Sequence, residues 1–284
     1  MEKRDSGVKM YMKRMQSEGF PTVASMILLS PLYRYVLINQ TRGLSKSSNA
    51  YNSISSYIIN VPSREGYLGY WRGTASSLAY FFLSSLISFR TYLYIRGRIF
   101  SNTDPSGNEL LIKEQISNMI TFTISELIAY PLERARTLVS CDLSLKGELR
   151  NYSGAYDCIQ KSMNRTGIKS WYYGFTMYLG TYTSFLIMAS SLWNLVKENK
   201  PELAFGIPIV VKSLLYPLEV LRRRRQIGDG IEYKEDFKAM HRQIMNIFKT
   251  EGIRGFYRGF LAAGVHSSLT FGIFMYFSEK KVQE

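Results

Sequence analysis

The segment Tyr216–Gln226 carries the main pattern of the sequence, and it reads Tyr-Pro-Leu-Glu-Val-Leu-Arg-Arg-Arg-Arg-Gln. A second segment, Glu-Gly-Ile-Arg-Gly-Phe-Tyr-Arg-Gly, follows it at Glu251–Gly259. Both segments have two related copies upstream. The copies of the first lie at Ser30–Val36 and Tyr130–Arg136, and those of the second at Glu65–Gly73 and Gly167–Gly174.

The spacing between the two segments is nearly constant. Pro31 to Gly66, Pro131 to Gly167 and Pro217 to Gly252 are 35, 36 and 35 residues apart. A constant internal spacing that recurs after roughly a hundred residues is typical of a repeat. We therefore predict one domain over residues 1–284 made of three repeats, with bounds at 1–105, 106–200 and 201–284.

The paired motifs resemble those of the mitochondrial carrier family. Each of its three repeats has Pro-x-Asp/Glu-x-x-Lys/Arg, followed by Glu-Gly and later by an aromatic residue, Lys/Arg and Gly. The run after Pro217-Leu218-Glu219 looks most like the ADP/ATP carrier branch, which has three arginines there; Arg225-Gln226-Ile227 replace that branch's three methionines. The resemblance implies an all-α membrane protein, a threefold pseudo-symmetric bundle of six transmembrane helices with three short helices on the matrix side.

The hydropathy pattern fits such a bundle, because six segments of about 20 residues match the roughly 30 Å of hydrocarbon in a bilayer. Prolines at 31, 131 and 217 are expected to kink the odd-numbered helices. The predicted long helices are 21–39, 74–95, 110–139, 176–196, 204–225 and 259–277, and the short ones are 51–61, 152–165 and 234–249.

The charge distribution favours a membrane protein over a nucleic-acid-binding one. The chain has 36 basic and 22 acidic residues, a net charge of +14. Residues 40–72, 140–173 and 222–258 sum to +10, whereas the segments expected on the opposite side sum to +2. Such asymmetry is typical of loops on one face of a membrane. The family resemblance implies the inner mitochondrial membrane, with both termini on the intermembrane-space side.

Catalysis and metal binding are not indicated. His241 and His266 are the two histidines, and no nucleophile motif accompanies them. Cys141 and Cys158 have no histidine at metal-ligand spacing, so we expect neither a zinc site nor a disulfide framework.

The repeated glycines have two interpretations. The resemblance implies that they begin helices whose free N–H groups bind cardiolipin headgroups, reinforced by the basic loops. Alternatively, they are only turns, and both interpretations can hold. The glycines are Gly66, Gly73, Gly167, Gly174, Gly252 and Gly259.

The resemblance also implies a matrix gate, in which each acid pairs with the base of the next repeat. The acid positions hold Tyr33, Glu133 and Glu219, and the base positions hold Val36, Arg136 and Arg222. Only Glu133–Arg222 is a complete pair, while Arg136 would face Tyr33 and Glu219 would face Val36. Arg34 lies about 160° around the helix from Val36, so it cannot simply replace it.

The opposite gate has lost its acids. The positions that the family fills with acids hold Thr91 or Tyr92, Asn194 and Ser278, while the bases Lys197 and Lys281 remain.

Substrate contacts are expected between the helices. Alignment with the nucleotide-carrying branch places them at Ala79, His266, Gly180 and Tyr182. Glu126 and Lys212 each lie seven residues before a gate acid, so both share the inward stripe. We predict a Glu126–Lys212 pair or a polar substrate contact, unless each side chain satisfies only a local group.

Two functions follow. The degenerate gates indicate a non-transporting accessory subunit of a larger inner-membrane complex of the respiratory-chain type, with bound cardiolipin and no other cofactor. The alternative is a carrier that exchanges a small anionic metabolite, ADP/ATP-like or other, by alternating access.

Overall fold

A computed structural model describes residues 19–42, 44, 51, 53–99, 108–143, 150–196, 207–228 and 240–283. These residues form helices and connecting turns, with no strand among them, so the all-α prediction is confirmed. The long helical segments are α2 (Phe20–Leu28) with α3 (Ser30–Gln40), α5 (Thr74–Ile99), α6 (Asn108–Cys141), α8 (Phe175–Val196), α9 (Ile207–Ile227) and α11 (Phe260–Gln283). The short helices are α4 (Ile54–Glu65), α7 (Ala155–Thr166) and α10 (Met240–Glu251), followed by 3₁₀ turns at η3 (Tyr67–Trp71), η4 (Ile168–Tyr172) and η6 (Ile253–Tyr257).

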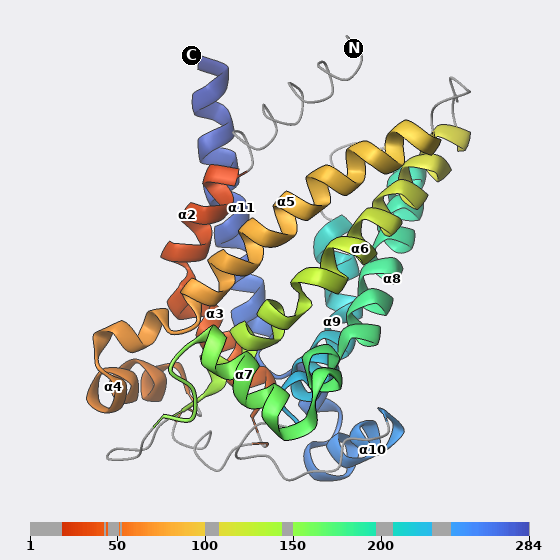
Figure 1. Ribbon diagram of the computed structural model, residues 1–284. Helices are drawn as coiled ribbons and strands as arrows, with labels where there is room; N and C mark the ends of the chain where they lie inside the picture. The colour runs from red at the N-terminus through yellow and green to blue at the C-terminus, as the bar shows by residue number, and fades with distance from the viewer. Residues whose placement is uncertain are drawn as a thin grey trace.

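The short helices gather at one end of the molecule. Figure 1 shows α4, α7 and α10 at the bottom, with the long helices running upward from them and the end of α11 at the top. We call the bottom the short-helix end. Each predicted long or short helix has a counterpart among the described residues, although 204–206 and 234–239 of two predicted helices lie outside them; the 3₁₀ turns were not expected.

The three prolines act differently on their helices. Pro31 lies at the start of α3, just after a break at Leu29 that bends α2 and α3 by 66°. Pro131 and Pro217 lie inside α6 and α9, which continue past them. The predicted kink is therefore a full break in the first repeat only.

The helices differ in how well they match a membrane. By length and composition, Tyr67–Ile99 and Ile253–Phe277 can each cross a bilayer, and the bent α2–α3 pair adds a third span if it counts as one. Helices α6 and α9 are long enough but less apolar than α5 and α11. In α6 and α9, ionisable residues such as Glu126 and Lys212 contribute to this. Membrane helices generally turn such residues toward the bundle interior.

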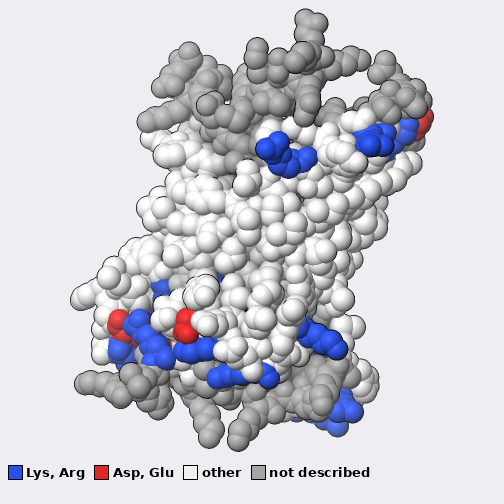
Figure 2. Space-filling model, viewed as in Figure 1, with Lys and Arg blue, Asp and Glu red and all other residues white. Residues whose placement is uncertain are grey.

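The charged side chains are distributed as expected for a protein that crosses a membrane. In Figure 2, lysines and arginines cluster toward the two ends of the visible face, and a belt of uncharged residues separates them. This belt is consistent with a surface that contacts lipid.

Close glycine contacts link the repeats. Gly73 precedes α5 with φ +89°, and a Cβ there would collide with Ser140 of α6. At the equivalent residues, a Cβ on Gly174 would lie 3.2 Å from the Arg222 carbonyl in α9, and one on Gly259 would lie 3.4 Å from the Val36 carbonyl in α3. Each repeat thus packs a glycine against the proline-containing helix of the next repeat, and the glycine of the third repeat packs against that of the first.

Candidate functional site: a polar network at the short-helix end

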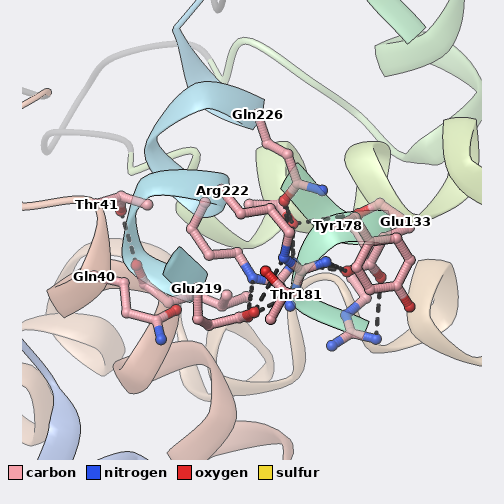
Figure 3. A network of polar contacts seen from close by, with 12 residues as sticks. Gln40, Thr41, Glu133, Tyr178, Thr181, Glu219, Arg222 and Gln226 are labelled. Atoms are coloured by element: carbon pink, nitrogen blue, oxygen red, sulfur yellow. Dashed lines mark hydrogen bonds and ion pairs between the residues drawn. The ribbon is translucent and has the colours of Figure 1, made fainter. Parts of the chain in front are cut away.

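Arg222 lies at the centre of a network that joins α6 and α9. Its guanidinium contacts Glu133 Oε1 at 3.2 Å and Glu219 Oε1 at 2.6 Å. It also lies over the ring of Tyr178 from α8, with Cζ 4.4 Å from the ring centre. Figure 3 shows these side chains converging. The structure therefore brings together the predicted Glu133–Arg222 pair.

Arg223 is a network residue that the motif comparison missed. Its Nη1 donates to Glu133 Oε1 at 2.8 Å and to Thr137 Oγ1 at 2.7 Å, while its Nε donates to Glu219 at 3.0 Å. Its Nη2 reaches the hydroxyl of Tyr33 on α3 at 2.9 Å. Arg223, itself in α9, thus contacts residues of α3, α6 and α9, the three helices that carry the repeated prolines.

Arg136 and Glu219, the two residues predicted to lack an oppositely charged gate partner, both have partners in the structure. Arg136 donates to the Tyr33 hydroxyl and lies over that ring at 4.4 Å. It also contacts Glu133 Oε2 in its own helix, at 3.4 Å. Glu219, expected opposite Val36, is held by Arg222 and Arg223 from its own helix. The gap left by Val36 is therefore closed within α9.

A second layer of contacts lies beside this network. Arg34 Nε donates to the Ser140 carbonyl, Arg134 Nε to the Gln226 carbonyl, and Arg224 Nε to the Gln40 carbonyl, at 2.9, 3.0 and 2.9 Å. The three acceptors are equivalent, because each lies nine residues after the proline of its repeat. One arginine thus links each neighbouring pair of the helices that carry the repeated prolines: α3 to α6, α6 to α9 and α9 to α3.

Arg34 and Arg224 also anchor short helices. Both oxygens of Glu65 on α4 accept from Arg34 at 2.9 Å, and both oxygens of Glu251 on α10 accept from Arg224 at 2.8 Å. As predicted, Arg34 does not substitute for Val36 in the gate ring. Its partner Glu65 was not anticipated.

Glu126 lies deeper in the bundle, next to tyrosines. Its Oε1 accepts from the Tyr80 hydroxyl at 2.7 Å, and Tyr80 lies 3.1 Å from the Tyr178 hydroxyl. In the part of the chain that the structure describes, no ion pair joins Glu126 to Lys212, whose side chain is exposed. The predicted pair is therefore replaced by a bond between α6 and α5.

The residues expected to contact substrate are only partly brought together. His266 packs on Tyr33, with ring centres 5.3 Å apart, and Tyr182 stacks on Phe122 at 3.4 Å. Ala79 and Gly180 are exposed and contribute no polar group.

A counting rule in the sequence would have found better candidates. Tyr80, Thr181 and His266 each lie seven residues after the final glycine of their repeat, at Gly73, Gly174 and Gly259. The expected positions Ala79 and Gly180 are therefore displaced by one residue, and Tyr80 is the side chain that reaches Glu126.

Other predicted residues have separate outcomes. The side chains of Asn194, Lys197, Ser278 and Lys281 lie outside the described residues, so the opposite gate stays a prediction. The six repeated glycines, Gly66, Gly73, Gly167, Gly174, Gly252 and Gly259, all have positive φ. That conformation supports the turn interpretation, and cardiolipin binding stays a prediction.

Both cysteines are buried free thiols. Burial raises the pKa of the Cys158 thiol in α7 to about 12. Among the described residues, no group of three or more His, Cys, Asp or Glu side chains is placed to hold a metal ion.

The chain is similar to known transport proteins along most of its length. The family model described as "Mitochondrial carrier protein" matches residues 109–200 and 207–282. The chain is 26% identical to ADP/ATP translocase 4 of Bos taurus over 87% of this chain and 81% of the bovine protein. It is 25% identical to ADP/ATP translocase 4 of Homo sapiens over 91% of this chain and 87% of the human protein. With the ADP,ATP carrier protein of Parachlorella kessleri, the identity is 24% over 88% and 78%.

The first predicted repeat, which holds Tyr33 and Val36, lies outside the two matched regions. The matches nonetheless cover more than half of the chain. With two copies of the paired motif in the matched regions and helices arranged as the motif implies, the chain belongs to the mitochondrial carrier protein family.

Proposed function

We propose that this chain is a carrier of the inner mitochondrial membrane that exchanges a small anionic metabolite, of the adenine-nucleotide type, by alternating access. The observation that carries the proposal is the network of Arg222, Arg223, Arg136, Glu133 and Tyr33, which ties the three odd helices together at one end. A carrier needs such a connection to close one side while the other side is open.

The composition of the network supports a switching role over a static one. A buried ion pair costs desolvation, and a well-packed apolar cluster of similar volume is often at least as stable. A subunit that only fills space would gain little from two buried arginines, Arg222 and Arg223, a buried Glu133 and the partly buried Arg136 and Glu219. A gate benefits from them, because its contacts can separate and be solvated when that side opens.

The charge balance supports an anionic substrate. Arg136, Arg222 and Arg223 outnumber Glu133 and Glu219 by one positive charge, and Tyr33 replaces the third carboxylate with a neutral hydroxyl. The exposed Lys212 adds a further cation. The similarity to ADP/ATP translocases makes adenine nucleotides the first candidates.

The carrier is favoured over the accessory subunit that the degenerate motifs indicated. That expectation rested on the missing acids of the opposite gate and on the gaps at Tyr33 and Val36, and for the second of these Arg223 and the Tyr33 hydroxyl supply contacts in the same region. We further propose that the short-helix end faces the matrix and that cardiolipin binds beside the repeated glycines, as the basic charge there supports.

The test is exchange by the purified chain in liposomes. Wild type is expected to exchange external labelled ADP, ATP or phosphate for internal unlabelled solute, and Arg223→Ala to lose most of this exchange. The control is Arg254→Ala, which changes an exposed arginine in η6. If wild type exchanges no anion and migrates in native gels only within a larger mitochondrial complex, the accessory-subunit function is correct instead.

A further inference from the structure

The carboxylate of Glu126 has one oxygen without a partner. The residue is 4% exposed, and its Oε1 accepts from Tyr80. Oε2 is buried and has no hydrogen-bond partner. A buried acceptor left unpaired costs about 1–3 kcal/mol or more when charged, so native structures generally supply a donor.

The neighbouring side chains form an aromatic wall. Tyr80 lies within hydrogen-bonding distance of Tyr178. Phe122 lies one helical turn before Glu126 and packs against Tyr178, with ring centres 5.3 Å apart. Its other neighbour, Tyr182, stacks on it at 3.4 Å. An acceptor beside aromatic rings suits a flat or cationic group that carries N–H donors.

Positive charge lies next to this acceptor. Arg222 is 4.4 Å from the ring centre of Tyr178, and Arg136 is 6.0 Å from that of Tyr80. Tyr80 thus adjoins both the acceptor and a cation, and its neighbour Tyr178 adjoins a second cation.

We propose that Glu126 Oε2 is a specificity contact for the amino group of the transported anion. The ligand class is a solute with both an N–H donor and an anionic group, such as an adenine nucleotide or an amino acid. This inference rests on the proposed carrier function and adds the residue that selects the substrate. Tyr80 is a positioning residue, because it holds the carboxylate through Oε1.

Pairs of solutes in which a carbonyl replaces an amino group provide the test. ADP and inosine diphosphate differ by an amino group in place of a carbonyl, as do glutamate and 2-oxoglutarate. Each solute is titrated against the purified chain in detergent, and binding is measured from the shift in unfolding temperature. We expect wild type to prefer the amino member of at least one pair by about tenfold or more, the effect of one hydrogen bond to a charged group.

The variants identify the contact. Glu126→Gln is expected to lose or reverse the preference, because an amide can present a donor to the carbonyl solute. Tyr80→Phe keeps the carboxylate but removes the hydrogen bond that holds Oε1, so it is expected to weaken the preference without reversing it. Glu109→Gln makes the same change at an exposed position of α6 and is expected to match wild type.

The outcomes separate this inference from the carrier function. The inference is wrong if Glu126→Gln keeps the wild-type preference, or if wild type binds none of the solutes or does not distinguish the members of either pair. Binding with an amino preference but without exchange in liposomes would overturn transport and leave the Glu126 contact standing. The pair that responds tells nucleotide from amino acid.

Discussion

The guanidinium of Arg136 lies 4.4 Å from the ring centre of Tyr33 and donates to its hydroxyl. The family motif places a carboxylate at this position, so a cation–π contact with a hydrogen bond replaces an ion pair. A cation over an aromatic ring contributes about 0.5–2 kcal/mol. The contact between α3 and α6 is therefore weakened and not abolished.

Tyr33→Phe is expected to lower stability by about 1–3 kcal/mol. The hydroxyl accepts from both Arg136 and Arg223, and removing it leaves buried guanidinium groups short of an acceptor. The measurement is the free energy of unfolding in detergent. Tyr35→Phe is the matched control, since the ring of Tyr35 packs on Tyr57 and would be kept. Equal effects of the two changes would contradict the role of the Tyr33 hydroxyl.

The Arg34–Glu65 pair is expected to be strongly coupled. Its side chains are 1% and 0% exposed, and its contact is 2.9 Å. Arg34→Met alone or Glu65→Gln alone should cost about 3–5 kcal/mol, because each leaves a buried charge unpaired. The double variant should cost clearly less than the sum. Additive losses would show that the two residues act independently.

Much of the fold could be predicted from the sequence, because proline and glycine spacing and apolar length are local properties. The Glu133–Arg222 pair was implied by the family resemblance, once the motif positions were assigned. Arg223 was missed because the motif assigns one base to each repeat, while spacing alone cannot tell which of four consecutive arginines reaches across. Glu65 was missed as the partner of Arg34 because they meet only when α4 folds back on α3.

The error at Glu126 has a different origin. Equal distances from the gate acids correctly placed Glu126 and Lys212 on matching positions of α6 and α9, but a shared height in the bundle does not bring two side chains into contact. Tyr80, from the neighbouring α5, reaches Glu126 first.

Glu126→Gln and Lys212→Met are accordingly expected to act independently. Their effects on the free energy of unfolding should add within about 0.5 kcal/mol, as for residues without a shared partner. Thermal unfolding of the wild type, both single variants and the double variant gives the cycle. A coupling above about 1 kcal/mol would restore the ion pair that the sequence suggested.

Cys158 is expected to resist thiol reagents until α7 unfolds. Its pKa is raised to about 12 by burial, so at pH 8 roughly one thiol in ten thousand is ionised, and the side chain is 1% exposed. The rate of maleimide labelling is measured between pH 7 and 9 in a Cys141→Ser background. An added exposed cysteine, Ser153→Cys, should react quickly and faster as the pH rises. If Cys158 is labelled as fast in the chain without Ser153→Cys as the added cysteine is, α7 opens in the native state.

Gly73→Ala tests whether the repeated glycines are needed for helix packing or only for lipid binding. The backbone there has φ +89°, and a Cβ would collide with Ser140, so we expect a loss of about 2–4 kcal/mol even in detergent free of cardiolipin. Gly264→Ala is the control, because that glycine lies within α11 and a Cβ there meets no atom within 4 Å.

Ser140→Gly provides the second arm, since it removes the side chain that the new Cβ would strike. In that background Gly73→Ala should cost less, leaving mainly the strain of the positive φ. If Gly73→Ala is harmless without cardiolipin and harmful only with it, the glycine acts on the lipid headgroup and the close approach to α6 is incidental. A loss of stability in both conditions, relieved by Ser140→Gly, establishes that the glycine is needed first for the contact between repeats.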